Sequence, residues 1–192
     1  TNSGAITVEE DFVPEDDDVN SIVDGPIASA SNRYGIHVLG GGTATGNLTN
    51  SGNITVDGLN SAGIAVDSTL NGNFLTSGTT LVTGDYSYGI RLASVTGNVT
   101  QRGVVTAVGE GAIALAVTGD VGGLLTLQGT LSQAASFTND DDGTSYLSRQ
   151  DLRVSAPAVL VAGNVAQGIV VAIPPTDTSS SDTDEDDDGV TD

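Results

Sequence analysis

The residues best suited to chemistry are carboxylates near the end of the chain. Asp184, Asp186 and Asp188 stand at alternate positions, and Gly189 follows, as in the first half of a D-x-D-x-D-G calcium loop. Alternate carboxylates on such a loop converge on one hard cation, and the glycine permits the sharp bend. We therefore predict a calcium site with the ligands Asp184, Asp186, Asp188 and Asp192. A solvated acidic tail is the alternative, since the position of the final bidentate glutamate of such a loop lies beyond residue 192.

Two further acidic runs, Asp16–Asp18 and Asn139–Gly143, are weaker candidates for cation sites. Their carboxylates are consecutive, so neighbouring side chains point apart and do not converge on one ion. Runs of this kind are more often simply exposed to water.

Catalytic groups are harder to find. A glycan-cleaving enzyme needs paired carboxylates, or a carboxylate with a metal and a base, on one face. Asp57, Asp67 and Asp85 fall at or next to turns, where aspartate is favoured for its own backbone hydrogen bonds. His37 is the only histidine, and no Gly-x-Ser-x-Gly nucleophile elbow accompanies it. We predict that the protein is not an enzyme.

Two other residue sets could bind or stack. Asparagines that follow corner glycines suggest a ladder of side-chain amides: Asn47, Asn73 and Asn98. Tyrosines close to one predicted corner could stack on sugars or pack against the edge: Tyr34, Tyr86 and Tyr88. Packing is the expected role of these tyrosines.

Composition limits the classes of partner. The chain has 192 residues, with 25 Asp and Glu against 5 Lys and Arg, and a net charge of −20. This balance argues against binding to nucleic acid or to an anionic membrane surface. No apolar run is long enough for a membrane-spanning helix, so the chain itself is not expected to span a membrane. Cysteine is absent, which excludes disulfides and thiolate metal sites.

The elements that must position these residues come from an internal repeat. Four glycines recur at intervals of 25 or 26 residues, and each has a second glycine six positions later; the first set is Gly46, Gly72, Gly97 and Gly123. Between the glycines, apolar and polar residues alternate over about five positions, as in short β-strands. Three such strands per repeat match one turn of a parallel β-helix. We predict an all-β, right-handed parallel β-helix of about six coils.

The repeat is interrupted twice and followed by a tail. Asn2–Val8 nearly duplicates Asn50–Val56, and Tyr34–Val38 echoes Tyr88–Leu92, so a first coil is present but is interrupted by an acidic insertion at about 9–31. A second insertion spans about 133–155. We predict a β-helix over 1–173 and a Pro/Ser/Thr/Asp-rich linker over 174–192 that holds the start of the calcium loop.

Three stretches carry a resemblance to a known family: NSGNITVDGLNSAGI from Asn50, VTGDYSYGIRLASVTGNV from Val82 and AVLVAGNVAQGIVVAIPP from Ala158. They resemble the β-helical passenger domains of autotransporters (type V secretion), of the alphaproteobacterial kind with Asp-rich loops. The resemblance covers essentially residues 1–192. It implies export to the bacterial cell surface, attached to the outer membrane through a C-terminal region that this sequence lacks, or release from it.

Together these features predict a non-enzymatic, extracellular structural or adhesion β-helix. Its expected partners are cell-surface or matrix ligands, or further copies of itself. One alternative is a filament or surface-layer subunit that stacks through the β-helix ends with the help of calcium. A second alternative, from the enzyme class, is a glycan-cleaving β-helix.

Overall fold

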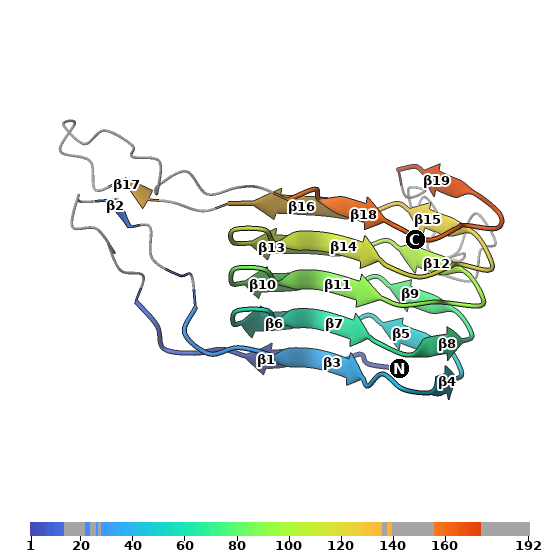
Figure 1. Cartoon of the computed structure of the whole chain (residues 1–192), viewed down its shortest axis with the longest axis horizontal. Helices are drawn as coiled ribbons and strands as arrows, with labels where there is room; N and C mark the ends of the chain where they lie inside the picture. Colours follow the sequence, from blue (N-terminus) through green and yellow to red (C-terminus); the bar gives the residue numbers. More distant parts are fainter. Residues whose placement is uncertain (14–21, 24–25, 27, 136–137, 140–155, 174–192) are drawn as a thin grey trace, which may run out of the picture.

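The computed structural model describes residues 1–13, 22–23, 26, 28–135, 138–139 and 156–173. Within these residues the regular structure is all strand, and the strands stack into a parallel β-solenoid (Figure 1). The predicted all-β parallel β-helix is therefore confirmed. In Figure 1 the chain crosses the front from left to right, returns behind and climbs away from the N-terminus, which is a right-handed coil.

Three parallel sheets of five strands form the walls. Sheet 1 contains β1 (Ile6–Val8), β6 (Ile54–Asp57), β10 (Thr80–Thr83), β13 (Val104–Val108) and β16 (Thr130–Ala134). Sheet 2 contains β3 (Tyr34–Val38), β7 (Ala62–Val66), β11 (Tyr88–Leu92), β14 (Ile113–Val117) and β18 (Val159–Val161). Sheet 3 contains β5 (Leu48–Asn50), β9 (Phe74–Thr76), β12 (Val99–Gln101), β15 (Leu125–Leu127) and β19 (Ile169–Val171). Each rung of the stack is called a coil, numbered 1 to 5 from the N-terminal end.

Two small strand pairs complete the described structure. In coils 1 and 2, β4 (Thr43–Thr45) and β8 (Thr69–Asn71) pair in parallel at the corner between sheets 2 and 3. In the coils above, isolated β-bridges connect this corner. They pair Leu70 with Val95, Val95 with Val121 and Val121 with Val165. The other pair, β2 (Ile22–Val23) with β17 (Thr138–Asn139), is antiparallel and lies beside the stack (Figure 1).

The number of coils is smaller than predicted. The described chain makes four complete turns from β1 to β16 and part of a fifth through β18 and β19, not about six. Both insertions lie within a coil: β1 and β3 belong to one coil, as predicted for the first insertion, and β16 and β18 belong to another. Repeat segments on the two sides of an insertion therefore belong to the same turn.

The core follows from strand alternation and the register of the coils. Inward positions stack directly, for example Ile36 on Ile64 on Ile90 in sheet 2. Ile64 and Ile90 are fully buried, as is Phe74 in sheet 3. The core is almost entirely aliphatic, as the composition predicts, and it runs without interruption through coils 2, 3 and 4. Because each coil has only three short walls, this burial depends on the neighbouring coils.

Glycine serves two different purposes at the corners. Gly84 and Gly109 follow sheet 1 with φ of 155° and 146°, conformations that a side chain rarely adopts. At another corner, a Cβ on Gly78 would strike the carbonyl oxygen of Gly52 in the coil below, so the glycine is needed for close approach. Corner glycines thus provide positive φ in the first set and close approach of two backbones in the second.

The first insertion leaves and rejoins coil 1 through hydrogen bonds around Glu10. Its carboxylate accepts from the backbone N–H groups of Ser29 (2.7 Å) and Ala30 (2.9 Å) and lies 3.5 Å from the Arg33 guanidinium. Burial raises the pKa of Glu10, but the hydrogen bonds from Ser29 and Ala30 outweigh it and leave the pKa below its usual value. The described part of the first insertion runs alongside the coils and does not cross the end of the stack (Figure 1).

Candidate functional site

A cluster of charged and aromatic side chains lies on the outer face of sheet 2, across coils 1 to 3. At its centre, the Asp67 carboxylate accepts two hydrogen bonds from Arg91, at 2.9 Å from Nε and 2.8 Å from Nη2. The Nε2 atom of His37 lies 2.8 Å from Asp67 Oδ2. The three side chains come from β3, the end of β7 and β11, so they tie three consecutive coils together.

The strand register explains why these side chains meet. His37 and Arg91 both stand opposite Ala65, one in the coil below and one in the coil above. The methyl group of Ala65 leaves room for both long side chains to lean over β7. Asp67 occupies the next outward position along that chain, so it receives both of them.

Tyrosines flank the cluster in the same arrangement. Tyr34 and Tyr88 stand opposite Ala62, again one coil below and one above. The Tyr34 ring stacks on His37 with the centroids 4.0 Å apart. The Arg91 guanidinium lies 5.2 Å from the Tyr88 centroid and 6.0 Å from that of Tyr34, within cation–π range. These two tyrosines pack, as expected, and Tyr86 stands apart at a turn with its side chain largely exposed.

The electrostatics of the cluster favour a fixed ion pair. The hydrogen bonds from Arg91 lower the pKa of Asp67, and that from His37 adds to the effect against the opposing influence of burial. Asp67 in turn raises the pKa of Arg91. A carboxylate that is held charged and engaged by the Arg91 guanidinium and the His37 ring is a poor general acid or base near neutral pH. The cluster is therefore suited to holding coils together.

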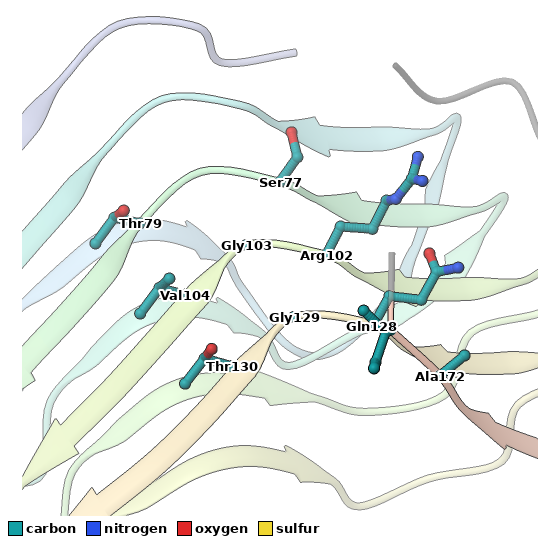
Figure 2. Close-up of a pocket in the computed structure, with 10 residues that line it drawn as sticks. Ser77, Thr79, Arg102, Gly103, Val104, Gln128, Gly129, Thr130 and Ala172 are labelled. Carbon is teal, nitrogen blue, oxygen red and sulfur yellow. The ribbon is translucent and has the colours of Figure 1, made fainter. Parts of the chain in front are cut away.

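A groove follows the corner between sheets 3 and 1 on another side of the solenoid. It has a volume of about 590 Å³ and crosses coils 3 to 5. Figure 2 shows Gly103 and Gly129 one above the other at the bend, with Thr79, Val104 and Thr130 on one side and Arg102 and Gln128 on the other. Ser77 adds a third hydroxyl. Glycine at the bend keeps the groove open, because each coil approaches the next backbone-to-backbone there.

The predicted calcium ligands cannot be placed. Asp184, Asp186, Asp188 and Asp192 lie outside the described residues, as do Asp16–Asp18 and the aspartates that follow Asn139. Among the residues that the structure describes, no three His, Asp or Glu side chains lie close enough to hold a metal ion. Calcium binding stays a prediction.

The remaining aspartates that sequence reasoning considered are dispersed. Asp57 ends β6 in sheet 1, and Asp67 belongs to the cluster on sheet 2. Asp85 is almost fully buried at a turn after β10, where it accepts a hydrogen bond of 2.8 Å from the Glu110 backbone. This contact joins one coil to the next and differs from the hydrogen bond to its own turn that the sequence predicts for aspartate.

The corner asparagines form a ladder of a different kind from the one predicted. Each side-chain oxygen accepts from a backbone N–H of the coil above: Asn47 from Asn73 (2.9 Å), Asn73 from Asn98 (2.8 Å) and Asn98 from Leu124 (2.9 Å). Each asparagine side chain therefore links its own coil to the backbone of the coil above.

Sequence reasoning missed three features. The Asp67 cluster joins residues 54 positions apart, although Tyr34-Gly-Ile-His and Tyr88-Gly-Ile-Arg share a pattern that could have pointed to it. A buried polar ladder was also missed: Asn50 is fully buried and accepts from Asn2 Nδ2 at 2.7 Å. No signal predicted the pairing of β2 with β17, which joins the two insertions.

Comparison with protein families, with curated protein sequences and with solved structures finds no match to the chain. No helix that could cross a membrane is found in the described part of the chain. Function must therefore be inferred from the fold and from the geometry of the cluster and the groove.

Proposed function

We propose that the chain is a non-enzymatic, extracellular β-solenoid that serves adhesion, displayed at a bacterial surface as part of an autotransporter-like protein. The observation that carries the proposal is the groove between sheets 3 and 1, supported on a continuous stack of coils. Hydroxyls of Ser77, Thr79 and Thr130 line it, with Val104 in the coil between Thr79 and Thr130. These hydroxyls can donate to and accept from the hydroxyls of an extended glycan.

The distribution of charge supports a binding role over a catalytic one. The three aspartates considered for glycan cleavage lie on sheet 1, on sheet 2 and at a turn, and Asp67 is engaged by Arg91 and His37. Glycoside hydrolysis requires two carboxylates across one scissile bond, roughly 5–10 Å apart. Of the described residues that line the groove, Arg102 is charged and none is a carboxylate.

The test is binding of the purified chain to a glycan array and to a collagen-coated surface. We expect retention on at least one of them, and a loss of about tenfold or more for Thr130→Trp, because the indole fills the groove. The matched control is Thr49→Trp, an outward threonine on the same solenoid in coil 1, far from the groove.

Failure of the wild-type chain to bind any surface, or equal binding by Thr130→Trp, would contradict adhesion through this groove. New reducing ends or unsaturated sugars in the same incubations would overturn the non-enzymatic assignment. Surface display is tested separately, by protease accessibility of the chain on intact cells of its source.

A further inference from the structure

Among the residues that the structure describes, the three walls have no partner strand at either end of the solenoid. At the upper end, β16, β18 and β19 are the last strands of their sheets, and at the lower end β1, β3 and β5 are the last. Each therefore presents one edge of backbone N–H and C=O groups that no sheet neighbour pairs. In Figure 1 no described segment lies below coil 1 or above coil 5.

The interior is open at both ends as well. At the upper end the inward residues Ile169 and Val171 are 49% and 78% exposed, whereas Leu125 and Leu127 directly below them are buried. At the lower end Leu48, Ile36 and Val38 are only half-buried, although Phe74, Ile64 and Val66 above them are fully buried. Aliphatic side chains at both ends thus lack the covering coil that every inner coil has.

We propose that a second copy of this chain covers each open end, so that the protein stacks head to tail through coil 5 of one copy and coil 1 of the next. This inference rests on the proposed structural role and names the partner. The same contact already exists four times within the chain, between successive coils, and the new interface continues it. The columns within the chain set the register: Ile6 of the next copy lies over Leu131, Ile36 over Val159 and Leu48 over Ile169.

The difference between the two ends determines which kind of assembly forms. The upper and lower ends are different surfaces, so the contact is heterologous and does not close on itself. Stacking then gives an open filament whose length grows with protein concentration.

Charge opposes the stacking and makes it dependent on salt. The chain carries −20, but only eight of its 25 acidic residues and three of its five arginines lie in the described residues. None of the inward residues at either end is charged. Repulsion between copies that each carry −20 is screened as the Debye length falls from about 20 Å in ~0.02 M salt to about 6 Å in ~0.3 M.

The experiment is sedimentation velocity over a concentration series at the two salt concentrations. We expect monomers at low salt and a concentration-dependent series of larger species at high salt. Val171→Asp blocks the upper end, and Leu48→Asp blocks the lower end. The control Leu81→Asp makes a matched change in charge at a residue 36% exposed on the outer face of coil 3, and it should assemble like wild type.

Mixing the two blocked variants gives the sharpest result. Each retains one open end, so an equimolar mixture should form dimers and nothing longer, while either variant alone stays monomeric. Circular dichroism and thermal melts of each variant separate blocked stacking from unfolding.

Wild type that remains monomeric at every concentration and salt level would overturn the inference, as would assembly that persists in both blocked variants. Assembly that Leu81→Asp also abolishes would overturn it too, because the contact would then lie on the side. The surface-binding test of the proposed function uses the monomer at low salt, so its failure and the failure of stacking are distinguished.

Discussion

The inner coils and the end coils are built from the same columns of residues but differ in what those residues contribute. Ile36, Ile64 and Ile90 occupy equivalent positions in coils 1, 2 and 3, yet only the latter two are completely buried. Likewise, Leu48 in coil 1 is only partly buried, whereas Phe74 directly above it in coil 2 is completely buried. In a solenoid a residue is stabilised by the coils above and below it, and its own coil contributes little burial. Position in the stack therefore decides the energetic effect of a side chain.

The inner coils and the end coils also differ in which groups they leave available for association. Inner coils satisfy their backbone groups within the chain, and their outer faces carry the Asp67 cluster and the groove. End coils expose backbone edges and interior side chains together, which makes them the natural sites for association. Mutations at equivalent positions in the two kinds of coil test the comparison directly.

The largest expected effect comes from deleting core volume. Ile64→Ala should lower the free energy of unfolding by about 2–5 kcal/mol, because it leaves a cavity between two covering coils. Ile36→Ala, the same substitution one coil lower, should cost about 1–2 kcal/mol, since its side chain is already partly exposed. Urea denaturation at low salt measures both. Equal losses would mean that the ends are as well packed as the centre.

A smaller difference is expected from adding a methyl group at a corner. Gly78→Ala places a Cβ against the Gly52 carbonyl of the coil below and should cost about 1–3 kcal/mol. Gly4→Ala is the equivalent change in coil 1, where nothing lies within 4 Å, and it should be nearly neutral. Thermal melts of the two variants provide the comparison. A large loss for Gly4→Ala would indicate that coil 1 has a covering neighbour.

The smallest expected effect concerns the ion cluster that joins coils 1 to 3. Asp67→Asn should cost about 1 kcal/mol near neutral pH, since the cluster is partly exposed and solvent screens it. The pKa of Asp67 is lowered in the folded chain, so its charged form stabilises the fold above the unfolded pKa of about 4, and this contribution is lost as the pH falls through the lower folded pKa.

Stability curves of wild type and Asp67→Asn should therefore converge below about pH 4 and differ above it. Asp11→Asn, which removes the same charge from an exposed residue outside the cluster, serves as the control for a general effect of net charge. A difference between wild type and Asp67→Asn that is constant from about pH 3 to pH 7 would contradict the role of the ionised carboxylate.

Much of the fold could be predicted from the sequence because coil stacking repeats one local pattern. The spacing of Gly46, Gly72 and Gly97 sets the length of a turn, and alternation between them sets which side chains point inward. The repeat showed that the first insertion interrupts one coil, but the number of coils was overestimated. The pairings of β16 with β13 and of β18 with β14 place the strands on both sides of the second insertion in one last coil.

The candidate sites were less predictable. The Asp67 cluster depends on Ala65 being small between His37 and Arg91, which is a property of three coils together. The groove depends on the angle between two sheets, which no local pattern specifies. Predicted ligands at Asp184, Asp186, Asp188 and Asp192 lie outside the described residues, so calcium binding remains to be tested by titration.

Amide hydrogen exchange across the transition from low to high salt tests the central claim most directly. In the monomer, amides of β1, β3, β5, β16, β18 and β19 should exchange faster than those of β7, β9, β11 and β12. On assembly, both sets of end strands should gain protection together, while the inner strands stay unchanged. Uniform protection in the monomer, or protection gained at one end alone, would contradict an account in which equivalent coils differ only by whether another coil covers them.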